Sequence, residues 1–222
     1  MQKNGKLIVI EGLDGSGKGT LSAMLCEELQ KRGVNARRIS FPMYDSPGAI
    51  PVKLYLDGKL GEHPEDTGAF AASTLYAVDR YISYRVDWGK ALESPDTVII
   101  ADRYTTSNAI HQLTKLPKAQ WDDFLAWLFD FEYRKLALPV PDATLYIELP
   151  PAMAKKLIAA RSAATGRQTD IHEQASDHLD RAYEAAIYAA EKLGWKRIPN
   201  FTGDDLRPLA ETFAEVLQKS GF

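Results

Sequence analysis

Short apolar runs alternate with longer segments of mixed apolar and polar residues along the whole chain. The runs 7–10, 97–101 and 143–147 are rich in apolar and β-branched residues, as is typical of parallel strands that are covered on both faces. Weaker patterns at 36–41 and 196–198 predict two further strands. The segments between these runs are long enough for helices, so the pattern indicates that strands and helices alternate.

The segments between the strands show the spacing of amphipathic helices. Leu21, Leu25 and Leu29 recur four positions apart until Gly33, a residue type that commonly ends a helix. Residues 43–63 are rich in Gly, Pro and Asp and predict a loop with a short helix. Further helices are predicted at about 64–92, from 106, over the aromatic run 121–131, at 151–161, at 175–193, and over a final segment that carries Leu206, Leu209, Phe213 and Val216.

This alternation predicts one α/β domain over residues 1–222. We expect a doubly wound, three-layer fold in which a mostly parallel five-stranded sheet is flanked by helices. In such sheets ligands bind beyond the carboxyl ends of the strands. The functional residues should therefore lie in the turns after Ile10, Phe41 and Ala101.

The composition excludes several classes of function. The chain has 222 residues, a formal net charge of −3 and a pI of about 5.8, so no basic excess favours a nucleic acid polymer or an anionic membrane. The single cysteine, Cys26, excludes an intramolecular disulfide. The apolar stretch near the N-terminus is too short for a signal sequence or a membrane span, so we expect a cytoplasmic protein.

A glycine-rich segment between the first strand and the first helix carries the strongest chemical signal. It consists of Gly12, Leu13, Asp14, Gly15, Ser16, Gly17, Lys18, Gly19 and Thr20. Glycines let backbone N–H groups point at a phosphate, the helix N-terminus adds partial positive charge, and a lysine can reach the outer phosphates. The segment predicts nucleotide binding. The alternative is a structural turn without a ligand.

The residue after the loop lysine departs from the usual pattern of such loops. A Ser or Thr at that position commonly ligates Mg²⁺, whereas this chain has Gly19, followed by Thr20. The loops of adenylate kinases look the same, so nucleotide binding is still predicted. Direct ligation of the metal by this loop does not follow from the pattern.

Four further segments resemble the thymidylate kinase family. They are 41–44 (Phe-Pro-Met-Tyr), 75–80 (Leu-Tyr-Ala-Val-Asp-Arg), 102–108 (Asp-Arg-Tyr-Thr-Thr-Ser-Asn) and 138–142 (Leu-Pro-Val-Pro-Asp). Together with the phosphate loop they occur in the family's order over nearly the whole chain. The resemblance implies a P-loop kinase fold with a mobile lid, ATP and Mg²⁺ as cofactors, thymidine monophosphate as the acceptor, and a homodimer.

The resemblance assigns roles to the charged residues of these segments. Phosphoryl transfer depends on in-line positioning and neutralised charge. Lys18 would contact the outer phosphates of the donor, and Arg103 would bridge the acceptor phosphate and the transferring group. Asp14 would lie near the 3′-hydroxyl of the acceptor sugar, and Asp14, Thr20 and Asp102 are the expected Mg²⁺ contacts, in part through water. The alternatives are a surface ion pair for Arg103 and a turn-stabilising side chain for Asp14.

The resemblance also implies an acceptor site. Phe41 and Tyr76 would hold the pyrimidine, and Arg80 would donate to its O4, which favours thymine or uracil over cytosine. The other acceptor residues are Pro42, Tyr44 beside the phosphate, Arg103, Ser107 and Asn108 on the Watson–Crick edge of the base, His111 and Gln112. Core packing is the alternative role for Phe41 and Tyr76, and an exposed ion pair is the alternative for Arg80.

His111 departs from the family, which usually has a tyrosine against the 2′ position of the sugar. Histidine is smaller and can form hydrogen bonds, so the resemblance does not imply a strict preference for deoxyribose at this position. We expect His111 to form part of the pocket wall, and a general base is the alternative.

The phosphate loop contains no arginine, and some thymidylate kinases supply a catalytic arginine from a mobile lid instead. The small, polar segment 161–173 resembles such a lid, with Arg161 and Arg167 as candidates for the residue that neutralises the transition state. The alternative is a solvated connector between two helices.

Two other functions remain open from the sequence. The first is a related kinase that acts on another nucleoside monophosphate or on a deoxynucleoside. Nucleoside kinases of this fold usually have a glutamate where this chain has Asp102, which favours a monophosphate acceptor. The second is a nucleotide-binding switch or ATPase that transfers phosphate only to water, a function that leaves Phe41, Tyr76 and Arg80 without a role.

Overall fold

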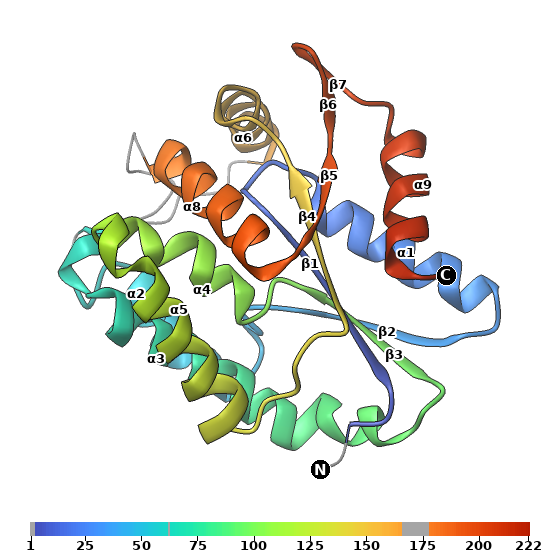
Figure 1. The fold of residues 1–222 in the computed structure, drawn as a ribbon, viewed down its shortest axis with the longest axis horizontal. Coiled ribbons are helices and arrows are strands. Elements are labelled where there is room, and N and C mark those ends of the chain that lie inside the picture. The colour runs from blue at the N-terminus through green and yellow to red at the C-terminus, as the bar shows by residue number, and fades with distance from the viewer. Residues whose placement is uncertain (1–2, 62, 166–177) are drawn as a thin grey trace.

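In the computed structural model, which describes residues 3–61, 63–165 and 178–222, five parallel strands form one sheet. The strands are β1 (Lys6–Gly12), β2 (Asn35–Ser40), β3 (Thr97–Asp102), β4 (Ala143–Glu148) and β5 (Lys196–Pro199), and their order is β2-β3-β1-β4-β5 (Figure 1). The chain first moves to one side of the central strand β1 and then to the other. In sheets of this kind ligands bind beyond the carboxyl ends of the strands.

Helices connect the strands and cover both faces of the sheet (Figure 1). They are α1 (Lys18–Lys31), α2 (Ile50–Leu56), α3 (Ala69–Ser83), α4 (Thr106–His111), α5 (Trp121–Phe129), α6 (Pro151–Thr165), α8 (His178–Leu193) and α9 (Leu209–Ser220). Single helical turns of other types lie at Pro47–Ala49, Pro64–Asp66, Tyr84–Trp88, Gly89–Glu93, Leu113–Lys115, Lys118–Gln120 and Asp130–Lys135. The predicted helix over 64–92 is thus a series of shorter pieces. Within the described ranges, no helix is both long and apolar enough to cross a membrane.

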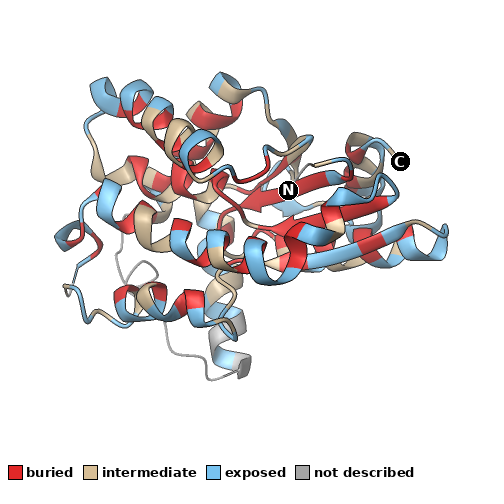
Figure 2. Cartoon of the chain, turned by 90° about the horizontal axis from the view of Figure 1, so that it is seen from below, coloured by how far each residue is buried: buried red, intermediate tan, exposed pale blue. Residues whose placement is uncertain are grey.

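Neighbouring residues of β1 face opposite sides of the sheet, and each side has its own core. Ile8 packs in one cluster with Leu25 of α1 and Val216 of α9. Val9 packs in another cluster with Trp88, which lies in the turn after α3. Figure 2 shows the buried residues gathered along the strands and on the inner faces of the helices. Because both faces are covered, the three central strands β3, β1 and β4 consist mainly of apolar residues. The predicted three-layer architecture is confirmed.

The segment before the last helix differs from the prediction. Phe201–Thr202 (β6) and Asp205–Leu206 (β7) form a short antiparallel hairpin, and α9 begins only at Leu209. Leu206 pairs with Phe201 in this hairpin and is 44% exposed, so its assignment to the final helix was wrong. The physical reason is Pro208, which directly precedes α9 and cannot donate a backbone hydrogen bond within a longer helix.

Candidate active site

A cavity of about 280 Å³ lies at the carboxyl ends of β1 and β3. Residues from the phosphate loop, from the end of β2, from α3 and from α4 line it. All of the predicted acceptor residues are among them: Phe41, Pro42, Tyr44, Tyr76, Arg80, Arg103, Ser107, Asn108, His111 and Gln112. The fold therefore brings together segments that are widely separated along the chain.

The phosphate loop connects β1 to α1 and accepts a hydrogen bond from a residue near the C-terminus. Gly15 and Gly17 have φ angles of 82° and 87°, in the left-handed region that side chains other than glycine rarely adopt. Asn200 Nδ2 donates to Ser16 O at 3.0 Å, and Asn200 Oδ1 accepts from Thr212 Oγ1 at 2.9 Å. No sequence signal pointed to Asn200, which is 184 positions from Ser16.

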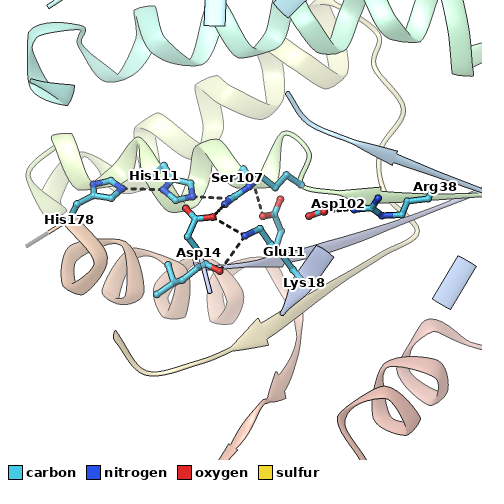
Figure 3. A network of polar contacts seen from close by, with 10 residues as sticks. Glu11, Asp14, Lys18, Arg38, Asp102, Ser107, His111 and His178 are labelled. Carbon is cyan, nitrogen blue, oxygen red and sulfur yellow. Dashed lines mark hydrogen bonds and ion pairs between the residues drawn. The ribbon is translucent and has the colours of Figure 1, made fainter. Parts of the chain in front are cut away.

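Asp14 joins the two cations of the predicted phosphate site. Its Oδ1 atom accepts from Lys18 Nζ at 3.1 Å and from Arg103 Nη2 at 2.6 Å. Figure 3 shows the Asp14 and Lys18 side chains directed toward each other. Burial alone would raise the pKa of Asp14, but Arg103 and Lys18 outweigh it and hold that pKa well below its ordinary value. Lys18 and Arg103 thus face one cavity, as the sequence predicted.

The turn after β3 holds Arg103 in an uncommon conformation. Its φ angle is 69°, in the left-handed region, and its backbone N donates to Ile10 O in β1 at 3.1 Å. Burial would lower the pKa of Arg103, but Asp14 outweighs it and the pKa is raised. The guanidinium therefore stays charged and points at the phosphate loop.

A buried carboxylate lies beneath this turn, and the sequence analysis did not predict a role for it. Glu11 is fully buried and accepts from Tyr104 N at 3.1 Å, from Thr106 Oγ1 at 2.6 Å and from Ser107 Oγ at 2.7 Å. Burial raises the pKa of Glu11 even though Arg103 lies nearby and opposes the shift. Glu11 thus fixes the side chains at the start of α4, and the hydroxyl group of Ser107 donates a hydrogen bond to Glu11. The available signal was a charged residue at the end of an otherwise apolar strand.

Asp102, at the end of β3, has one oxygen that suits a metal or its water. Arg38 Nη2 donates to Asp102 Oδ2 at 2.7 Å, whereas Oδ1 is buried and has no hydrogen-bond partner among the described residues. A Cβ atom on Gly19 would lie 3.3 Å from Oδ2, so the glycine after the loop lysine leaves space beside this carboxylate. Thr20 is exposed and does not line the cavity.

The charged residues do not form a closed metal cage. In the part of the chain that the structure describes, no group of three or more His, Cys, Asp or Glu side chains is arranged to hold a metal ion. Mg²⁺ commonly binds through one or two carboxylates together with substrate phosphates and water. Asp102 fits that kind of site, in which most of the ligands arrive with the nucleotide.

The aromatic and basic residues at the end of the cavity away from the phosphate loop line the cavity and also pack against buried side chains. Phe41 packs against Tyr104 with a ring-centroid distance of 5.9 Å, and Tyr76 packs against Tyr55 at 6.1 Å. Arg80 is only 1% exposed and forms an ion pair inside the protein. The alternative of an exposed ion pair for Arg80 was therefore wrong.

His111 links Arg103 to a second histidine. Arg103 Nη1 lies 3.0 Å from His111 Nε2, and His111 Nδ1 lies 3.2 Å from His178 Nε2, with the two rings stacked (Figure 3). Because arginine only donates, His111 Nε2 must accept, so its proton lies on Nδ1 and is donated to His178. A general-base role for His111 is disfavoured, because Arg103 occupies its lone pair. The sequence carried no signal for His178.

Residues 166–173 of the predicted lid lie outside the described residues, and so do the side chains of Arg161 and Arg167. The helix α6 continues to Thr165, four residues beyond its predicted end.

Comparison with known proteins shows the family of the chain. A family model described as thymidylate kinase matches residues 10–198. The chain belongs to the thymidylate kinase family. The thymidylate kinase of Mycobacterium tuberculosis is 30% identical over 213 residues, which cover 94% of this chain and 97% of that protein. The thymidylate kinase of Leptospira borgpetersenii is 32% identical over 155 residues, which cover 69% of this chain and 68% of that protein.

A solved structure of thymidylate kinase from Candida albicans has the same fold. It matches with a TM-score of 0.68 and 20% sequence identity, over 98% of this chain and 92% of that one. The family predicted from the sequence is confirmed. As a member of the thymidylate kinase family, the chain is a phosphotransferase that uses a nucleotide phosphate donor and acts on small nucleotides, so the interpretation as a switch or ATPase is not favoured.

We expect His178 to make the stability of this thymidylate kinase family member depend on pH. Burial lowers the pKa of His178 from 6.5 to about 4 in the folded protein. The unfolded chain therefore binds the proton more readily than the folded protein. The free energy of unfolding is highest above pH 6.5 and decreases as the pH falls from 6.5 through 4. The total loss is about 3 kcal/mol.

Urea unfolding between neutral and acidic pH measures this effect. The variant His178→Gln should lose less stability on acidification than the wild type. His63→Gln, at an exposed position, is the matched control and should keep the wild-type slope. Equal slopes in the wild type and in His178→Gln would contradict the prediction.

Proposed function

We propose that this protein transfers the γ-phosphate of Mg·ATP to thymidine monophosphate and so produces thymidine diphosphate and ADP. One observation carries the proposal: Lys18 and Arg103 meet on Asp14, at 3.1 and 2.6 Å, in the cavity that the acceptor residues line. Phosphoryl transfer needs the donor and acceptor phosphates to be in line and their charge to be neutralised. Two cations fixed at one point of a shared cavity supply both conditions.

At the phosphate end of the cavity, neighbouring side chains hold Lys18 and Arg103 in position before nucleotides bind. Asp14 engages one N–H of Lys18 and one of Arg103, and His111 engages another N–H of Arg103. Leu13 O accepts from a second N–H of Lys18 at 3.3 Å. Lysine has three donors and arginine five, so one N–H of Lys18 and three of Arg103 are left for phosphate oxygens. Lys18 holds the outer phosphates of the donor, and Arg103 bridges the acceptor phosphate and the transferring group. When bound, Mg²⁺ neutralises the β- and γ-phosphate oxygens, and Asp102 would hold it through water.

The opposite end of the cavity receives the base. Phe41 and Tyr76 hold the pyrimidine ring, and Arg80 donates to an acceptor oxygen at position 4. Thymine and uracil have an oxygen at that position, whereas cytosine has an amino group that itself donates. The chemistry of Arg80 therefore supports thymidine monophosphate over deoxycytidine monophosphate as the acceptor.

The product formed from Mg·ATP and a panel of nucleosides and nucleoside monophosphates tests this function. We expect thymidine diphosphate as the main product, because the cavity holds both a phosphate site and a site for a pyrimidine with an oxygen at position 4. Another diphosphate, or a phosphorylated nucleoside, would show that the acceptor is wrong. ATP hydrolysis at the same rate with every acceptor would contradict the kinase function itself.

We also propose that Arg161 or Arg167 supplies positive charge to the transition state. The proposal rests on the family resemblance and on the absence of arginine from the phosphate loop. One of the variants Arg161→Ala and Arg167→Ala should lower turnover by about 10²-fold or more, or roughly 3 kcal/mol, while Mg·ATP still binds. Arg134→Ala removes an arginine whose side chain is 79% exposed and is the control. Full turnover in both lid variants would contradict the proposal.

We propose a homodimer whose interface includes α3. Apolar side chains at 70, 78 and 81 lie on one side of this helix and are exposed, and Val86 in the next turn is 75% exposed. A cluster of exposed apolar residues marks an interaction surface. Light scattering at micromolar concentration should give about twice the chain mass of 24.7 kDa. Val78→Asp should shift the mass toward the monomer without changing the circular dichroism, and a monomeric wild type would contradict the proposal.

A further inference from the structure

A buried carboxylate lies behind the wall of the cavity at its base end. Glu132, in the turn after α5, is fully buried. It accepts from Arg80 Nε at 2.7 Å and Nη2 at 2.5 Å, from Thr105 Oγ1 at 2.8 Å and from Asn108 Nδ2 at 3.2 Å. A carboxylate has about four acceptor positions. Glu132 is therefore saturated by donors from α3, α4 and the turn before α4.

This carboxylate fixes the orientation of Arg80. The two parallel hydrogen bonds from Nε and Nη2 hold the guanidinium plane in a single position. Burial would lower the pKa of Arg80, but Glu132 outweighs it and the pKa is raised. Two of the five N–H groups of Arg80 are used in this way, so the two on Nη1 and one on Nη2 remain as donors on a residue that also lines the cavity.

The same carboxylate fixes which edge of the Asn108 amide faces the cavity. The Nδ2 group of Asn108 points at two acceptors, Glu132 Oε1 at 3.2 Å and Ser73 O at 3.5 Å. Turning the amide over would place its carbonyl oxygen against these two acceptor oxygens with no hydrogen between them, which is unfavourable in a buried site. The carbonyl oxygen of Asn108 is therefore the edge left for the cavity that this residue lines.

Arg80 and Asn108 thus present a donor and an acceptor to the same cavity. Thymine and uracil carry the complementary groups side by side, because O4 accepts and N3–H donates. Cytosine carries the opposite pattern, because its 4-amino group donates and N3 accepts. The order of donor and acceptor that Arg80 and Asn108 present, rather than the shape of the cavity, distinguishes these bases.

We propose that Glu132 is a specificity-determining positioning residue. It does not meet the acceptor, but it sets the polarity of the edge that Arg80 and Asn108 present and so selects thymine-type over cytosine-type monophosphates. This inference rests on the proposed function, which places the base against these two side chains. A site built to hydrogen-bond a substrate group rejects analogues that lack it, because buried polar groups of the protein are then left unpaired.

Two acceptors of equal shape give the sharpest test. Thymidine monophosphate and 5-methyl-deoxycytidine monophosphate share the 5-methyl group and differ only in the group at position 4 and the proton on N3. For the wild type, the kcat/KM ratio of the two should favour thymidine monophosphate by at least about 100-fold. This ratio responds to polarity and not to the size of the pocket.

The variant Glu132→Gln keeps the shape of the side chain and replaces one acceptor oxygen with a donor. That donor faces Arg80 in either orientation of the amide, together with Asn108 or with Thr105, so the two parallel hydrogen bonds that fix Arg80 are lost. We expect the ratio to fall at least about 10-fold, with a change in the KM for ATP of less than about twofold. Thr105→Val removes a Glu132 contact without touching Arg80 or Asn108 and is the matched control, for which the ratio should stay within about threefold.

The possible results separate the inference from the proposed function. An equal loss on both acceptors in Glu132→Gln, with the ratio unchanged, would overturn the inference, because Glu132 would then only support the fold. A wild type that forms no thymidine diphosphate would overturn the proposed function and this inference with it. A wild type that forms it, with an unchanged ratio in Glu132→Gln, overturns the inference alone.

A second variant covers the case in which Glu132→Gln does not fold. The double variant Arg80→Met/Glu132→Leu replaces the buried ion pair with apolar side chains, an exchange that buried ion pairs commonly tolerate. It leaves Asn108 free to present either edge of its amide. Arg80→Met alone is the reference, because it removes the donor to O4 and keeps the contact of Glu132 with Asn108. A lower ratio in the double variant than in Arg80→Met supports the inference, and an equal ratio in the two overturns it.

Discussion

The carboxylate of Asp14 holds together the two cations on which the whole site depends. Lys18 reaches it from the first turn of α1 and Arg103 reaches it from the turn after β3. Like charges in a partly buried cavity repel strongly unless an opposite charge lies between them. Asp14 therefore allows the phosphate loop and the β3 turn to meet before a nucleotide binds. His111 and Glu11 complete this arrangement, one beside Arg103 and the other beneath the turn.

Buried carboxylates organise the rest of the cavity wall. Glu11 accepts hydrogen bonds from the donors at the start of α4, and Glu132 accepts them from Arg80, Thr105 and Asn108. Burying a charge is costly, and an apolar core of similar volume is often at least as stable. What a buried carboxylate adds here is a fixed direction for every donor around it. A site that distinguishes bases by the placement of donors and acceptors depends on such fixed directions.

Most of the fold followed from local patterns in the sequence. The apolar runs of β1, β3 and β4 and the glycine-rich segment before Lys18 depend on residues close together in the chain, so spacing alone was informative. The final helix shows where this reasoning fails. Leu206 fits the apolar spacing of α9, but Pro208 separates it from the helix and it pairs in the β6–β7 hairpin instead.

The sequence by itself determined the alternation of strands and helices, the phosphate loop, the family, and most of the residues that line the cavity. The tertiary structure decided the partners of those residues. Arg80 meets Glu132 across 52 positions, His111 meets His178 across 67, and Ser16 meets Asn200 across 184. No spacing rule links such pairs, because hydrogen bonds and desolvation depend on which side chains the completed fold brings to the same place. The sequence therefore predicted most of the side chains that line the cavity, whereas their orientations came only from the folded chain.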